Sequence, residues 1–85
     1  MNKRTLLVIL LKNRRTEAVQ VQKILTDYGC IIKTRLGIHD GVLDACSNTG
    51  LIILELVGAA GDIKKLSLRL NAIKGVKTKL VRISI

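Results

Sequence analysis

Continuous apolar runs and regularly spaced apolar positions alternate along the chain, and each kind of pattern predicts a different element. Residues 5–11 (TLLVILL) and 51–57 (LIILELV) are short and almost wholly aliphatic, and Glu55 is the one acidic interruption. Runs of this length and composition are typical of strands that are buried on both faces. We therefore expect these two segments to lie at the centre of a sheet.

Two further segments have the pattern of sheet edges. In residues 30–38 the period is two, which places on one side Ile32, Thr34, Leu36 and Ile38 and on the other Lys33 and Arg35. Residues 76–85 (VKTKLVRISI) also carry two lysines, Lys77 and Lys79. Charged side chains discourage a strand from pairing with other chains, so both segments are expected to form edge strands.

Two segments have the spacing of amphipathic helices. The first apolar stripe consists of Ala18, Val21, Ile24, Leu25 and Tyr28, and the second consists of Ile63, Leu66, Leu70 and Ile73. We expect the first helix to begin at Thr16 and to end at Gly29 in the C-terminal cap position. Asp62 is the expected N-cap of the second helix, and Gly75 is expected to end it.

The expected order of elements is strand, helix, strand, strand, helix, strand. Right-handed crossovers place both helices of such a chain on the same face of the sheet. We therefore predict an α+β fold, a ferredoxin-like βαββαβ sandwich of the ACT-like type. It has a four-stranded antiparallel sheet with two helices on one face, and residues 1–85 form one domain. Residues 39–50 are rich in turn formers and predict a loop, and residues 58–61 predict a tight turn into the second helix.

The two central runs are apolar on both of their faces, although a fold of two layers covers only one. In residues 51–57, three side chains can face the helices (Ile52, Leu54 and Leu56), which leaves on the opposite side Leu51, Ile53, Glu55 and Val57. A monomer would then expose a larger aliphatic patch than soluble monomers normally do. We predict a homo-oligomer that covers this open sheet face through two-fold contacts, in which Glu55 pairs with Arg35 of the neighbouring strand.

Composition narrows the functional classes. The 85 residues include 15 Lys and Arg against 6 Asp and Glu, for a net charge of +9, and Tyr28 is the only aromatic residue. The charge leaves open an alternative function, a basic protein that binds nucleic acid through backbone electrostatics. Recognition of RNA bases by a four-stranded sheet needs surface aromatic residues for stacking, and the expected strands have none.

The chain offers little material for catalysis or for a metal centre. Four potential ligands fall within eight residues, namely His39, Asp40, Asp44 and Cys46, but their spacing matches no closed zinc pattern. We therefore expect no enzyme activity, no metal and no cofactor. A thiol or metal sensor that uses Cys46 is a further alternative. The two cysteines form no disulfide framework and no run approaches the ~20 apolar residues of a membrane span, so we expect a cytoplasmic protein with no membrane partner.

Several short motifs, none of them catalytic, carry a resemblance to a known family. They are Tyr28-Gly29 at the end of the first helix, Arg35-Leu36-Gly37-Ile38, the apolar run into Gly58, Gly61-Asp62-Ile63 and Lys74-Gly75-Val76. With these motifs the sequence resembles the family of iron-only hydrogenase system regulators, which are ACT-like proteins related in fold to the C-terminal domain of nickel-responsive repressors. The resemblance implies an oligomeric regulatory module. The chain lacks the several-histidine-and-cysteine ligand set of the nickel-responsive repressors.

From the residues and the resemblance together we predict a non-catalytic regulatory or ligand-sensing module that is a homo-oligomer and binds a small molecule. The ligand is expected near Arg35, His39 and Asp40, beside the subunit contact. In this prediction Arg35 holds an anion, and His39 tunes its binding near neutral pH.

Overall fold

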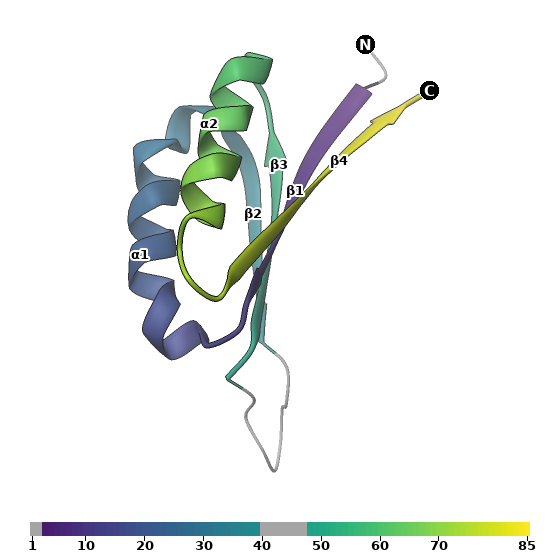
Figure 1. Cartoon of the computed structure of the whole chain (residues 1–85). Helices are drawn as coiled ribbons and strands as arrows, with labels where there is room; N and C mark the ends of the chain where they lie inside the picture. Colours follow the sequence, from purple (N-terminus) through teal and green to yellow (C-terminus); the bar gives the residue numbers. More distant parts are fainter. Residues whose placement is uncertain (1–2, 40–47) are drawn as a thin grey trace.

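A four-stranded antiparallel sheet carries two helices on one face in the computed structural model, which describes residues 3–39 and 48–85 (Figure 1). The elements follow in the order β1 (Lys3–Leu11), α1 (Arg14–Asp27), a 3-10 turn (Gly29–Ile31), β2 (Ile32–His39), β3 (Gly50–Leu56), α2 (Ala60–Asn71) and β4 (Val76–Ser84). This order confirms the predicted ferredoxin-like βαββαβ fold.

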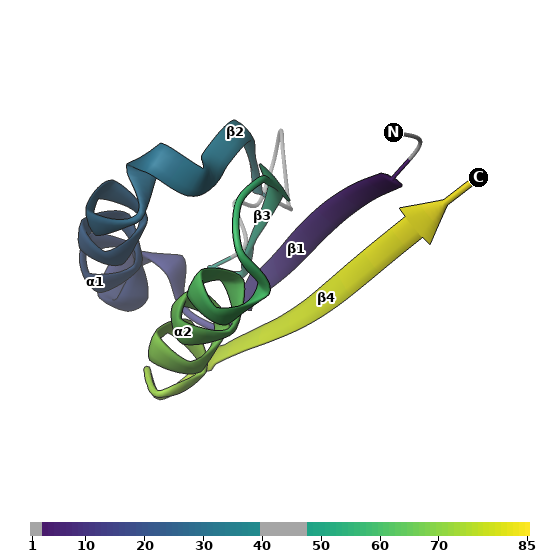
Figure 2. The same cartoon turned by 90° about the horizontal axis from the view of Figure 1, so that it is seen from above.

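The strands lie in the order β2-β3-β1-β4, and each pairs antiparallel with its neighbour. The two aliphatic runs thus form the central strands β1 and β3, and the lysine-bearing segments form the edges, as predicted. The N-terminal end of β1 and the C-terminal end of β4 remain paired beyond the helices and project from them as a two-stranded ribbon (Figures 1 and 2).

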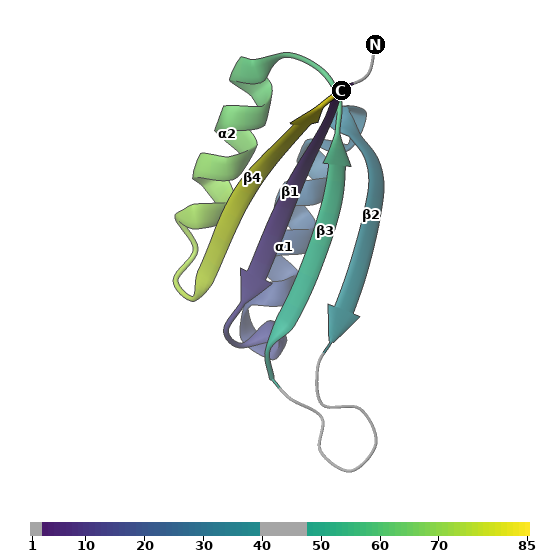
Figure 3. The ribbon, with the colours of Figure 1, turned by 90° about the vertical axis from the view of Figure 1, so that its right-hand side faces the viewer.

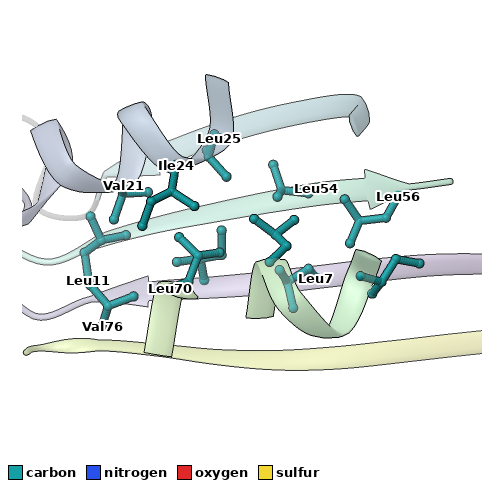
Figure 4. Close-up of a cluster of buried hydrophobic side chains, with 12 residues drawn as sticks. Leu7, Leu11, Val21, Ile24, Leu25, Leu54, Leu56, Leu70 and Val76 are labelled. Carbon is teal, nitrogen blue, oxygen red and sulfur yellow. The ribbon is translucent and has the colours of Figure 1, made fainter. Parts of the chain in front are cut away.

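The hydrophobic core lies between the sheet and the helices (Figure 4). Its largest fully buried side chains are Leu7, Ile9, Leu11, Val21, Leu25, Leu54, Leu66, Leu70 and Val76. Alternate residues of β1 and β3 enter this core, because successive side chains of a strand lie on opposite faces of the sheet. The stripes predicted for the two helices supply the other side of the core.

The helix ends differ from the sequence prediction. Helix α1 begins at Arg14, two residues before Thr16, and ends at Asp27 with Tyr28 as its C-cap. Gly29 does not end the helix in a left-handed conformation. It opens the 3-10 turn instead, in which the N–H of Ile31 donates to the carbonyl of Tyr28 at 3.1 Å. The tighter turn thus satisfies the carbonyl of the C-cap residue Tyr28 without a left-handed glycine.

Helix α2 also begins earlier than predicted. Its N-cap is Ala59, whereas Asp62 lies in the first turn and donates its backbone N–H to the carbonyl of Ala59 at 3.1 Å. The chain leaves β3 through Gly58, whose φ of +101° makes the tight turn predicted for residues 58–61. The helix also ends earlier than predicted, at Asn71 with Ala72 as its C-cap, so the prediction that Gly75 ends it is wrong. Gly75, with a φ of +87°, instead makes the turn into β4.

A bulge in β2 reverses part of the predicted alternation. Ile32 lies opposite Leu56, yet Thr34 lies opposite Glu55, so the register shifts by one residue between them. Ile32 therefore packs against the core, and the prediction that it shares a side with Leu36 is wrong. The extra residue of a bulge shifts the alternation of side chains by one, so two residues that an unbroken strand would place on the same side lie on opposite sides.

Candidate functional site

Figure 3 shows the sheet face opposite the helices. On this face the central strands β1 and β3 carry mostly aliphatic side chains, whereas edge strand β4 carries Lys77 and Lys79. The central side chains of the face are Leu6, Val8 and Leu10 on β1, Leu51 and Ile53 on β3, Leu36 on β2 and Val81 on β4. We call these seven residues the open face. Leu10 and Leu36 are 49% and 54% exposed, and within residues 3–39 and 48–85 no further element covers them. The apolar outward side predicted for the central strands is confirmed.

Glu55 is the one carboxylate on this side of the described sheet. It lies opposite Leu6 on β1 and Thr34 on β2, and its side chain is only 17% exposed. The guanidinium of Arg4 donates a hydrogen bond to it, with Nη1 and Oε2 2.8 Å apart. The ion pair provides a partner for the mostly buried carboxylate of Glu55, which would otherwise be an unpaired charge on an apolar surface.

The predicted pairing of Glu55 with Arg35 is wrong. After the bulge in β2, Arg35 lies opposite Leu54, a fully buried residue on the helix side of the sheet. Arg35 and Glu55 are therefore on opposite faces, although their strands are neighbours. Sequence alternation across β2 could not reveal this, because the bulge leaves no mark in the composition.

A hollow of about 690 Å³ is lined by residues from the start of β1, the end of β3, the start of α2 and the end of β4. We call it the basic hollow, and Figure 2 shows these elements from above. Four cationic side chains and one carboxylate line it, namely Lys3, Arg4, Lys33, Arg82 and Glu55. This site could not be predicted from the sequence, since Lys33 and Arg82 lie far along the chain from the adjacent Lys3 and Arg4 and only strand pairing brings them to one hollow.

A second hollow of about 560 Å³ lies beside the turn between β1 and α1. Its lining includes Glu17, which is 7% exposed and is the one buried charged residue in the described part of the chain. The backbone N–H of Asn13 donates to Oε1 of Glu17 at 2.9 Å, and the side-chain oxygen Oδ1 of Asn13 is buried without a partner among the described residues. Glu17 thus ties the start of α1 to the turn that precedes it.

The ligand site predicted from the sequence begins in the middle of β2. Arg35 is exposed on this edge strand, and His39 is the last residue of the strand, opposite Gly50. Asp40 lies outside the described residues, so the ligand role of these three residues stays a prediction. Arg35 does not line the basic hollow.

The proposed thiol and metal chemistry is placed only in part. Cys30 is exposed in the 3-10 turn, and Cys46 and Asp44 lie outside the described residues. Among the residues that the structure describes, no three His, Cys, Asp or Glu side chains gather closely enough to hold a metal ion. No helix within the described ranges is both long and apolar enough to cross a membrane.

Residues 3–80 match the model of a protein family, TM1266-like, described as "Iron-only hydrogenase system regulator, putative". No curated protein sequence matches the chain significantly. Among solved structures, the uncharacterized protein TM1266 of Thermotoga maritima is similar with a TM-score of 0.80 and 30% sequence identity. That similarity covers 96% of this chain and 99% of TM1266.

Two more distant structures share the fold. CPII of Thiomonas intermedia K12, solved with ADP, AMP and acetate, has a TM-score of 0.63 and 11% identity over 99% of this chain and 89% of CPII. A formyltetrahydrofolate deformylase of Pseudomonas putida KT2440 has a TM-score of 0.58 and 19% identity over 92% of this chain. Only 28% of the deformylase takes part in that similarity, so it concerns a fraction of the enzyme.

Proposed function

The chain belongs to the TM1266-like family of iron-only hydrogenase system regulators, and from this premise we propose that it is a non-catalytic regulatory module that acts as a homo-oligomer. The observation that carries the oligomer is the open face. Its aliphatic area is continuous over the central strands β1 and β3 and reaches Leu36 on β2 and Val81 on β4, and its seven side chains are all aliphatic. A contiguous patch of this kind marks an interaction surface, because water-exposed aliphatic area is costly when nothing covers it.

A second copy of the chain suits this surface. The centre of the open face is aliphatic, and Lys77 and Lys79 lie beside it at the β4 edge of the sheet. In a two-fold contact the same patch meets itself, so the aliphatic centres coincide and the lysines fall at the rim. Stacked sheets pack about 10 Å apart, with interdigitated side chains.

The ion pair on the open side of the sheet is also compatible with burial of that side in an interface. Glu55 is already paired with Arg4 of its own chain at 2.8 Å, so covering the open face would not leave an unpaired carboxylate in the interface. A pair that loses water together costs less than a single buried charge. Arg4 itself is 65% exposed at the margin of the surface, where its charge can stay hydrated.

The regulatory role requires a signal, and a small molecule is the kind we favour. CPII, which shares the fold, was solved with bound nucleotides, although at 11% identity this concerns the fold alone. The sequence prediction places the ligand near Arg35, His39 and Asp40, and the basic hollow offers a second, geometrically defined location.

Native mass spectrometry on protein purified in high salt tests the proposal. We expect an oligomer with an even number of subunits. Extra mass that is lost on denaturation would identify a bound small molecule by weight. A monomer across the whole range of protein concentrations would refute the role assigned to the open face.

The net charge of +9 supports a second candidate, the binding of nucleic acid through backbone electrostatics. This candidate predicts an affinity for any duplex that falls steeply with salt, because each neutralised phosphate releases counterions. Fluorescence anisotropy with one labelled duplex at several salt concentrations distinguishes the two functions. An affinity that is negligible at physiological ionic strength would exclude the second candidate.

A further inference from the structure

The basic hollow gathers cations from three strands. Arg4 and Lys3 come from the start of β1, Arg82 from the end of β4, where it lies two residues before the last position of the strand, and Lys33 from the bulge in β2. A volume of about 690 Å³ lies within the range of small-molecule sites. The four side chains line one hollow only in the folded protein, because Lys33 and Arg82 lie far from Lys3 and Arg4 in the sequence.

The charges in the hollow are not balanced from within the described chain. Glu55 is its only carboxylate, and it is already bound by Arg4 at 2.8 Å. The structure shows no ion pair for Lys3, Lys33 or Arg82 with any carboxylate of residues 3–39 and 48–85. Like charges that face one hollow repel one another, and a bound anion would offset that repulsion.

The first turn of α2 opens into the same hollow. Ala60, the first residue of the helix, and Ile63 both line it. The N-cap residue Ala59 has no side chain that could accept a hydrogen bond from the first backbone amides. The backbone N–H groups of Ala60 and Gly61 have no acceptor within the helix, whereas that of Asp62 donates to the carbonyl of Ala59. The helix dipole adds partial positive charge at this end, which the carboxylate of Asp62 in the first turn offsets in part. The dipole therefore reinforces the cations of the strands.

The lining is apolar on its remaining side. Leu56, Val57 and Ile63 contribute aliphatic surface next to the cations. We infer that the basic hollow binds a small organic phosphate, with the phosphate held by Arg82 and the start of α2, the organic part against the aliphatic side chains, and the charge of Lys33 on the far side of the hollow adding to the attraction. This inference deepens the proposed regulatory function and rests on it, because it names the ligand class that the module senses.

Isothermal titration calorimetry with ADP, inorganic phosphate and adenosine tests the inference on the full chain. The double variant Lys33→Gln/Arg82→Gln removes two cations of the hollow, and Lys23→Gln/Lys65→Gln removes two exposed lysines of α1 and α2 that lie outside it. We expect saturable binding of ADP and none of adenosine. The hollow variant should weaken ADP binding at least ~10-fold and the control variant less than ~2-fold, as charge-assisted hydrogen bonds imply.

A second variant separates binding from folding. Ala60→Asp places a carboxylate at the first helical position, where it stabilises a helix through the dipole but competes with an anionic ligand. We expect an unchanged or higher melting temperature together with a ~10-fold weaker affinity for ADP. Unchanged ADP affinity in this variant would contradict the inference.

Three further results would overturn it. They are equal losses in the hollow and control variants, no saturable binding of either ADP or inorganic phosphate, and binding of a single-stranded oligonucleotide that depends on the hollow while ADP does not bind. The subunit count from native mass spectrometry is independent of all three. An oligomer without phosphate binding would overturn this inference alone, whereas a monomer that binds ADP would overturn the assembly proposal alone.

Discussion

The carboxylate of Glu17 on α1 occupies the space beside the α-carbon of Gly75, at the turn into β4. An ideal Cβ on Gly75 would overlap Oε2 of Glu17 and lie 2.9 Å from its Cδ. The same carboxylate accepts the backbone N–H of Asn13, so one buried side chain holds two turns that are 62 positions apart in the sequence, at residues 13 and 75. Gly75 is required here for two reasons, its φ of +87° and this contact.

Gly75→Ala is therefore expected to lower the free energy of unfolding by about 2 kcal/mol or more, because a Cβ adds left-handed strain and displaces Glu17. Gly61→Ala is the matched control, since a Cβ at that helical position meets no atom within 4 Å. The control should be neutral or more stable by up to about 1 kcal/mol. Chemical denaturation followed by circular dichroism measures both. Equal stability of the two variants would contradict the assigned contact.

Ile53→Lys should convert the oligomer into a folded monomer. Ile53 lies at the centre of the open face, between Val8 on β1 and Leu36 on β2, so a charge there has to be desolvated in any face-to-face contact. Leu68→Lys is the control, because Leu68 is 60% exposed on α2, in the helix layer on the other side of the sheet. Light scattering after size-exclusion chromatography measures the mass of each. Dissociation by both substitutions would point to a contact through the helices.

Arg4→Gln should cost about 1 kcal/mol of stability, because it leaves the carboxylate of Glu55, 17% exposed, without its partner. The double variant Arg4→Gln/Glu55→Gln should recover part of this loss, since no unpaired charge remains. Urea titration of Arg4→Gln, of Glu55→Gln and of the double variant gives the coupling energy. Strict additivity would mean that the 2.8 Å contact contributes nothing to stability.

Asn71→Ala should weaken the outer edge of the sheet. The side chain of Asn71 donates to Oγ1 of Thr78 at 2.8 Å and accepts the backbone N–H of Thr78 at 3.0 Å, which satisfies a donor on edge strand β4. We expect a loss of about 1 kcal/mol and faster amide exchange at Thr78. Gln22→Ala on the exposed side of α1 serves as the control. Slow exchange at Thr78 in the Asn71 variant would show that another acceptor replaces the amide.

Much of the fold follows from local patterns. The aliphatic runs that became β1 and β3 have too few polar positions for an edge, and the helical stripes are regular enough to fix which side of each helix is buried. Helix boundaries were less predictable, since Asp62 has the chemistry of an N-cap but Gly58 turns the chain early enough for α2 to start at Ala60. The position of a turn decides which capping residue is used.

The sequence by itself determined the order of the elements, the central strands and the aliphatic outward side of the sheet, because hydrophobic periodicity records which faces avoid water. Only the tertiary structure decided which charges meet. Arg4 pairs with Glu55 in place of Arg35, and Lys33 and Arg82 reach one hollow, because a one-residue bulge in β2 and the paired ends of β1 and β4 set those positions. Charge pairing depends on register, and register is a property of the folded sheet.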